Sequence, residues 1–208
     1  GWVDGRDLAG TWDEGSARVV AVRRRRVGEI VVEERPLERI EPEALRTTLL
    51  EGICRMGINC LPWDRETRQL QARIHWLRTW QPQADWPDVR DETLLQDLGW
   101  LAPYLDGITR AEQLSRLKLK DIFLNGLGWE RQQQLARLAP ETCTVPSGSK
   151  IRIDYQIDAP PLLAVRIQEM FGLRETPTVC GGRGPRVLHL LSPARRPIQV
   201  TTDLAGFW

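Results

Sequence analysis

The stretch Lys150-Ile151-Arg152-Ile153-Asp154-Tyr155-Gln156-Ile157 alternates without interruption between polar and apolar side chains. An alternation with a period of two residues predicts a strand with one buried and one solvated face, as in antiparallel sheets. A turn signal, Pro146-Ser147-Gly148-Ser149, precedes it, and a short β-like run from Thr142 to Val145 comes before the turn. The last third of the chain is therefore expected to contain a β-sheet.

The residues that follow predict the rest of a small sheet. After Pro160 and Pro161, apolar residues at helical spacing begin with Leu163 and Ile167, which favours a helix that Gly172 ends. The later elements are expected to be a strand from Val187 to Leu191, a turn from Ser192 to Pro197 and a partner strand from Ile198 to Thr202. This order predicts a small antiparallel sheet with a covering helix.

Upstream, the pattern changes to helices. Pro42 and Gly57 bound an apolar stripe, and a second helix, with Trp76 and Trp80 as an i, i+4 pair, is expected from about Asp64. Helical pattern then continues to about residue 139, with an interruption at Gly128, and residues 17 to 35 predict a β-hairpin around Gly28. The expected fold class is α+β: a helical middle segment plus a small antiparallel sheet with a covering helix, preceded by a β-hairpin. The helical segment is placed at residues 41–140 and the small α+β segment at 141–208, and 41–208 can also form one domain.

Charge gives only a local signal for nucleic-acid binding. Lys and Arg number 29 against 28 Asp and Glu, a formal net charge of +1, whereas chains that hold nucleic acid unaided usually carry a larger basic excess. Basic residues do gather in the last third, and guanidinium groups suit phosphate contact. The candidate nucleic-acid-binding residues are Lys150, Arg152, Arg183, Arg186, Arg195 and Arg196. If the last hairpin pairs near the strand at 150–157, these groups form one basic surface; the alternative is a solvated face.

The sequence lacks the motifs of a nucleotide-hydrolysing motor. Gly148-Ser149-Lys150 has the letters of a phosphate loop in the wrong order, and Gly181-Gly182-Arg183-Gly184 is followed by Pro185 rather than by a helix. The acidic pair Asp91-Glu92 follows a proline-bounded loop, so it is expected to begin a helix rather than to hold magnesium. No catalytic residue and no cofactor are expected in this chain.

Cysteines and histidines do not form a metal-binding pattern. The four cysteines, Cys54, Cys60, Cys143 and Cys180, contain no Cys-x-x-Cys pair, and neither His75 nor His189 has a neighbour at ligand spacing. His75 is interpreted as a partly exposed or packed side chain, and His189 as a side chain embedded in a strand of the sheet. With no signal peptide and no long apolar run, the chain is expected to be cytoplasmic, with reduced thiols and without membrane contact.

Long ordered blocks of the chain resemble the C-terminal region of HrpB-type DEAH-box ATP-dependent RNA helicases. In the C-terminal half the matching blocks are Thr144–Ser149, Ile153–Tyr155, Leu163–Leu173, Thr176–Pro177, Gly181–Arg183, Leu188–Pro193, Pro197–Thr201 and Asp203–Trp208. Upstream they are Glu34–Leu37, Leu50–Ile53, Leu61–Trp63 and Trp100–Leu105. The resemblance covers about residues 17 to 208.

The resemblance implies that the chain is a piece of a bacterial ATP-dependent helicase. In that family two RecA-like lobes, which belong to a preceding part of the protein, bind ATP and Mg²⁺, and an OB-like module follows. Residues 1–40 are similar to the tail of that module or to the linker after it. The chain is thus expected to be a non-catalytic accessory region that docks on the helicase core and assists RNA binding, with weak RNA binding alone. The alternative is a protein-interaction or structural module without nucleic-acid binding, anchored by tryptophans such as Trp76, Trp80 or Trp86.

Overall fold

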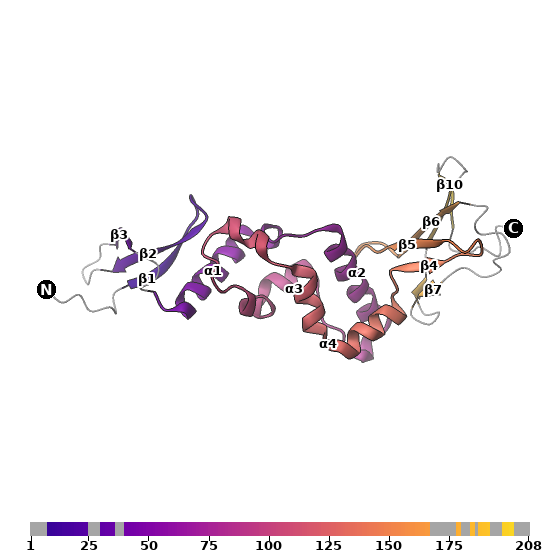
Figure 1. Ribbon diagram of the computed structural model, residues 1–208, viewed down its shortest axis with the longest axis horizontal. Helices are drawn as coiled ribbons and strands as arrows, with labels where there is room; N and C mark the ends of the chain where they lie inside the picture. The colour runs from indigo at the N-terminus through magenta and orange to yellow at the C-terminus, as the bar shows by residue number, and fades with distance from the viewer. Residues whose placement is uncertain are drawn as a thin grey trace. The chain divides into compact units, whose positions relative to one another are not determined.

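The computed structural model describes the backbone of residues 8–24, 30–35, 40–166, 178–179, 184–185, 187–191 and 197–201, and the side chains of residues 9–22 and 40–165. The chain is divided into two compact units. Figure 1 labels the helices and strands along the chain. The first unit is Gly1–Trp63 with Asp91–Ile122, and the second is Asp64–Arg90 with Phe123–Trp208. The α+β class expected from the sequence is confirmed.

The first unit begins with a three-stranded antiparallel sheet. Its strands β1 (Leu8–Asp13), β2 (Arg18–Arg24) and β3 (Ile30–Arg35) lie in chain order. The hairpin expected over residues 17–35 is confirmed by the pairing of β2 with β3, and its turn at Gly28 lies outside the described residues. Strand β1 is an addition that the Gly- and Asp-rich sequence did not indicate.

Helix α1 (Pro42–Met56) packs against this sheet. It begins with Pro42 and ends at Gly57, whose φ of 91° places it in the left-handed region that favours glycine. Trp12 of β1 is 5% exposed and lies over Gly52 of α1, where a Cβ atom would overlap with the indole ring. The absence of a side chain at position 52 therefore permits this contact between helix and sheet.

The remaining helices of the first unit are short. They are η3 (Ile58–Cys60), α3 (Asp91–Gln96), η5 (Leu98–Trp100), η6 (Ala102–Tyr104) and η7 (Ala111–Arg116). The expected start of a helix at Asp91-Glu92 is confirmed, because both acidic residues lie in the first turn of α3. Backbone hydrogen bonds from Val19 N to Thr109 O (2.8 Å) and from Ala111 N to Ala17 O (2.9 Å) join β2 to the start of η7.

The second unit contains the long helices. Helix α2 (Arg65–Trp80) begins where the sequence predicts, because the Asp64 carboxylate accepts a hydrogen bond from Thr67 N at 2.7 Å. The 3-10 turn η4 (Pro82–Ala84) follows. Helix α4 (Leu119–Leu138) starts in the first unit and is interrupted at Gly128, whose φ of 78° and ψ of 168° are not helical. The interruption that the sequence predicts at Gly128 is confirmed.

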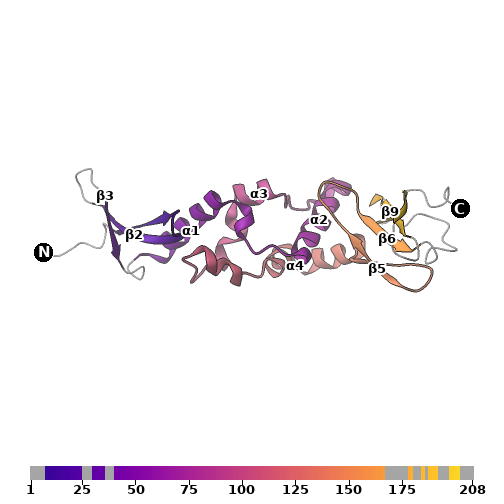
Figure 2. The same ribbon diagram turned by 90° about the horizontal axis from the view of Figure 1, so that it is seen from above.

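A five-stranded sheet completes the second unit (Figure 2). Its strands, in spatial order, are β10 (Pro197–Thr201), β9 (Val187–Leu191), β6 (Leu162–Arg166), β5 (Lys150–Asp154) and β4 (Thr142–Thr144). A separate two-stranded pair joins β7 (Thr178–Val179) to β8 (Gly184–Pro185). The strands expected near 142–145, 150–157, 187–191 and 198–202 are all present.

The prediction of a helix from Pro160 is wrong over Leu162–Arg166, which form β6 in the middle of the sheet. A short apolar run cannot be assigned to helix or strand by periodicity alone, and pairing with a neighbour on each side decides for the strand. Strand β6 runs parallel to β9, so the sheet is mixed, whereas its other pairs are antiparallel. The rest of the expected covering helix, residues 167–172, lies outside the described residues.

Among the residues that the structure describes, no helix is long and apolar enough to span a bilayer.

The contact between Trp12 and Gly52 predicts a specific sensitivity of the first unit. We expect Gly52→Ala to lower stability by about 1–3 kcal/mol, the usual cost of an overpacked site, because the new methyl group meets the indole ring. Thermal unfolding followed by circular dichroism measures the effect. Gly126→Ala is the matched control, since a Cβ atom there meets nothing within 4 Å and alanine favours helix. An unchanged midpoint in Gly52→Ala would show that the indole can move aside.

Candidate nucleic-acid interface

A polar stripe on helix α2 positions the strand that carries two of the candidate basic residues. Gln69, Arg73 and Trp76 lie at positions i, i+4 and i+7, so their side chains share one face of the helix. We call these three residues the α2 clamp. Each of them donates a hydrogen bond to the segments that flank β4 and β5.

Gln69 of the clamp pairs with the backbone where β5 ends. Its Nε2 donates to Asp154 Oδ1 (2.6 Å) and to Tyr155 O (3.1 Å), and its Oε1 accepts from Tyr155 N (2.8 Å). The amide thus satisfies both backbone groups of Tyr155, as a neighbouring strand would. Trp76 continues the pairing, because its Nε1 donates to Gln156 O at 2.5 Å. The exit of β5 is therefore tied to α2 at three consecutive residues.

Arg73 holds the segment before β4. Its Nε donates to Ala139 O at 2.7 Å, and its Nη1 lies 3.4 Å from a Glu141 carboxylate oxygen. Burial lowers the pKa of Arg73, while the charge of Glu141 acts in the opposite direction. The guanidinium keeps its proton at neutral pH, so a buried cation is compensated by a carbonyl and a carboxylate.

Two further hydrogen bonds join the end of β5 to the segment before β4. Tyr155 Oη donates to Pro140 O at 2.7 Å, and Ile153 N donates to Glu141 O at 2.9 Å. Residues 139–141 and 153–156 are thereby held to one another and to the α2 clamp. The direction of β5, and with it the face that β5 exposes, follows from these contacts.

The clamp predicts that Gln69→Ala weakens the attachment of β5. We expect a loss of about 1–3 kcal/mol in unfolding free energy, because the Tyr155 N–H and C=O lose their partners in a partly buried place. Hydrogen exchange at the Tyr155 amide should become faster. Arg65→Ala is the control, since Arg65 is an exposed residue of the same helix. Unchanged protection of the Tyr155 amide would contradict a positioning role for Gln69.

The exposed face of β5 carries the two basic residues. Lys150 and Arg152 are exposed while Ile153 is 1% exposed, which confirms the alternation read from the sequence. Lys150 pairs with Thr144 and Arg152 with Thr142, both exposed, and directly opposed residues share a face. Asp154, the next residue on this face, accepts hydrogen bonds from Gln69 and Gln156. Among the described residues, neither cation forms an ion pair.

Strand register places Lys150 at one particular end of the sheet. Ile153 pairs with Leu163, and continuing this antiparallel register brings Lys150 level with Arg166. Arg166 pairs with Leu191, and Leu191 pairs with Pro197. We call this row, together with Arg152 on the exposed face of β5, the basic sheet end. The connection between Leu191 and Pro197, which contains Arg195 and Arg196 in the sequence, begins and ends there.

Val187, which follows Arg186 in the sequence, lies at the opposite end of the sheet. Val187 pairs with Leu162, and Leu162 pairs with Asp154. The last hairpin does not pair with β5, because β6 lies between β5 and β9. Arg183, Arg186, Arg195 and Arg196 themselves lie outside the described residues, so the structure places only Lys150 and Arg152 on one exposed face.

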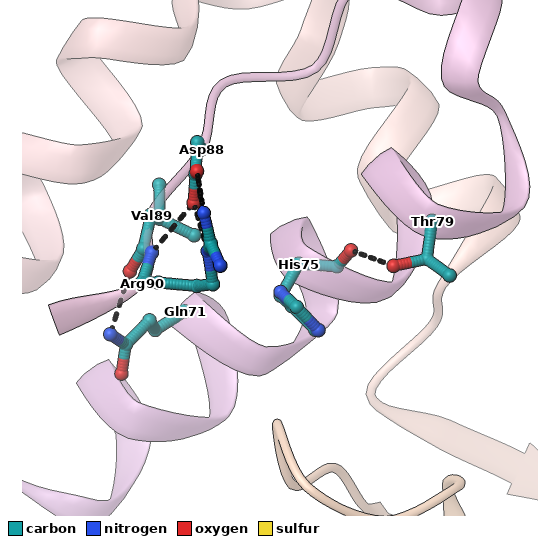
Figure 3. Close-up of polar contacts among 6 residues, drawn as sticks. All are labelled: Gln71, His75, Thr79, Asp88, Val89 and Arg90. Atoms are coloured by element: carbon teal, nitrogen blue, oxygen red, sulfur yellow. Dashed lines mark hydrogen bonds and ion pairs between the residues drawn. The ribbon is translucent and has the colours of Figure 1, made fainter. Parts of the chain in front are cut away.

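His75 lies on α2 beside the loop that Gln71 holds (Figure 3). Gln71 Nε2 donates to Val89 O at 2.7 Å, and the neighbouring residues Asp88 and Arg90 form an ion pair at 2.7 Å. The imidazole packs edge-on against the Trp76 ring, with centroids 5.6 Å apart. Burial lowers the pKa of His75; Asp88 opposes this effect, while Arg90 and Arg78 add to it. His75 is therefore a packed, neutral side chain at pH 7.

The lowered pKa predicts how His75 affects stability. Since the folded state disfavours the imidazolium, stability is kept above the ordinary pKa of 6.5 and decreases as pH falls below it. Proton NMR titration should give His75 a pKa below 6.5, with His75→Gln assigning the signal, because the sequence has only two histidines. A measured pKa above 6.5 would mean that Asp88 dominates over burial.

The tryptophans differ in how far their rings are exposed to a binding partner. Trp86 is 3% exposed and packs under the Arg131 guanidinium at 5.0 Å, so it is not an exposed anchor. Trp76 stacks on Trp80 with centroids 5.5 Å apart, which confirms the pair expected from their spacing. Sequence reasoning overlooked Trp129, which is 73% exposed and begins the helical segment after Gly128. Its position directly after an expected helix break was the available signal.

Among the described residues, no group of three or more His, Cys, Asp or Glu side chains could hold a metal ion. Burial raises the pKa of Cys60 to about 11, so this thiol is protonated at neutral pH.

Comparison with known proteins identifies the family. A family model described as the ATP-dependent helicase C-terminal region of HrpB matches residues 100–208, just over half of the chain. The chain belongs to the HrpB C-terminal family. A second model, the connector region of ATP-dependent RNA helicase HrpB, matches residues 11–37, which include most of β1–β3.

The HrpB relatives extend well beyond this chain. ATP-dependent RNA helicase HrpB of Escherichia coli is 42% identical over 198 residues, which are 95% of this chain and 24% of the relative. The crystal structure of the E. coli DExH-box NTPase HrpB matches with a TM-score of 0.80 and 41% identity over 97% of this chain and 25% of that one. A crystal structure of the E. coli DEAH/RHA helicase HrpB gives a TM-score of 0.76 with 39% identity over 97% of this chain and 26% of that one. The chain thus corresponds to about a quarter of an HrpB helicase.

Proposed function

We propose that this HrpB C-terminal region is a non-catalytic accessory element of a cytoplasmic ATP-dependent RNA helicase, and that it holds single-stranded RNA through phosphate contacts at the basic sheet end. The observation that carries the proposal is the exposed face of β5, where Lys150 and Arg152 lie side by side without an acidic partner among the described residues. Two adjacent cations with exposed threonines opposite them offer charge and hydrogen-bond donors to phosphate oxygens.

The rigidity of β5 supports this role. The α2 clamp fixes the segments on either side of the β4–β5 hairpin, so the two cations are presented from an ordered strand. The only acidic residue on the same face of β5, Asp154, is engaged by the amides of Gln69 and Gln156. On this face Lys150 and Arg152 carry two positive charges against the one negative charge of Asp154, although the chain is almost neutral overall.

The remainder of the helicase supplies the other functions in this proposal. ATP and Mg²⁺ bind to motor lobes that belong to the larger protein, onto which this region docks. A patch of few cations binds RNA weakly alone, and the motor supplies most of the affinity. Counterion release makes the contribution of this patch fall steeply with salt.

Replacing both cations tests the proposal. We expect Lys150→Gln with Arg152→Gln to weaken binding of a single-stranded RNA and to reduce the slope of log affinity against log salt by about 1.4, because each lost phosphate contact contributes about 0.7. Fluorescence anisotropy at several salt concentrations measures both quantities. The control pair is Arg116→Gln with Lys118→Gln, which removes two exposed cations outside the sheet. Equal affinity and slope in the β5 variant and the wild type would remove this face as an RNA contact.

A further inference from the structure

We propose that Trp129 stacks on an unpaired base of the bound RNA, while Gln133 and Arg137 on the same helical stripe contact the adjoining nucleotide. The site is separate from the basic sheet end and depends on other residues. It rests on the proposed function only in that RNA is the ligand, and it adds a source of preference for single strands.

The backbone explains why this indole is exposed. Gly128 interrupts α4, so Trp129 is the first residue of a new helical segment. Helical side chains point toward the N-terminal turn, which here is the kink with its two glycines. A Cβ atom built on Gly126 or Gly128 would meet nothing within 4 Å, so the space beside the kink is open. An aromatic ring at this place has room for a flat ligand against it.

The residues around Trp129 favour a ligand that is both aromatic and polar. The exposed positions on the following turns are Glu130, Gln133, Gln134, Ala136 and Arg137. A large contiguous apolar patch would mark a protein-docking surface, and the exposed residues that follow Trp129 are polar apart from Ala136. A nucleobase combines a π face with hydrogen-bonding edges, and stacking on Trp is a common way of binding single strands.

Trp129, Gln133 and Arg137 present an indole, an amide and a guanidinium in this order along the helix. A nucleotide has a base, a ribose and a phosphate that could contact these three groups. Positions i, i+4 and i+8 share a face, and the rise over eight residues is about 12 Å. The indole can bind a base, the Gln133 amide can donate to a base edge or ribose, and the Arg137 guanidinium can contact a phosphate. Arg137 is the exposed arginine of this helix segment, whereas Arg131 is engaged with the Trp86 ring and with Ala84 O at 3.2 Å.

Stacking and phosphate contact respond differently to salt, which separates this site from the basic sheet end. Binding of the whole 208-residue chain to a fluorescent single-stranded RNA, and to an RNA duplex of equal length, is measured over a range of salt concentrations. We expect Trp129→Ala to weaken single-strand binding about 5- to 150-fold, the range for loss of one stacked base, with an unchanged salt slope. Duplex binding should not change. Trp129→Phe should retain most of the affinity.

Trp129→Leu is the decisive control, because leucine keeps an apolar side chain but offers no ring. It should behave like Trp129→Ala; retained RNA affinity in Trp129→Leu would overturn stacking in favour of apolar contact. Unchanged affinity in Trp129→Ala, together with a loss in the Lys150 and Arg152 variant, would overturn this inference and leave the proposed function in place. Absence of RNA binding by the wild-type chain would overturn both. Thermal midpoints should match across the variants, since Trp129 is 73% exposed.

Discussion

The hydrogen bonds from α2 to the backbone around β4 and β5 are the constraint on which the second unit depends. Where a strand ends, its backbone groups are no longer paired with a neighbouring strand and need other hydrogen-bond partners. For Tyr155, directly after β5, the side-chain amide of Gln69 supplies them. Arg73 and Trp76 follow Gln69 on the same face of α2. Arg73 donates to Ala139 O before β4, and Trp76 donates to Gln156 O after β5. The helix thus provides the alignment as well as the apolar cover.

This arrangement has a consequence for charge. The chain is nearly neutral, so a positive surface can exist only where acidic neighbours are absent or already engaged. On β5 the clamp engages Asp154, and Lys150 and Arg152 project from the same face. The α2 clamp therefore positions the strand that carries these two cations.

Much of the architecture could be predicted from the sequence because the signals were local. Pro42 and Gly57 mark the two ends of α1, Asp64 caps α2, and the alternation from Lys150 onward gives the faces of β5. Other features could not be predicted in this way. Residues 162–166 form a strand because they have partners on both sides, and β1 forms because β2 is available to pair with it. For the candidate site, the exposure of Lys150 and Arg152 was predicted from alternation, whereas that of Trp129 was overlooked, since its position after a helix break is a weak signal among nine tryptophans.

The sequence by itself determined the α+β class, the two ends of α1, the start of α2 and the alternating faces of β5, because each of these depends on residues within a few positions of one another. Only the tertiary structure decided the strand order β10-β9-β6-β5-β4, the parallel pairing of β6 with β9, and the role of Gln69 as a partner for Tyr155. The physical reason is that hydrogen bonds between distant segments form wherever the folded chain brings donors and acceptors together, and this juxtaposition leaves no periodic pattern in the sequence.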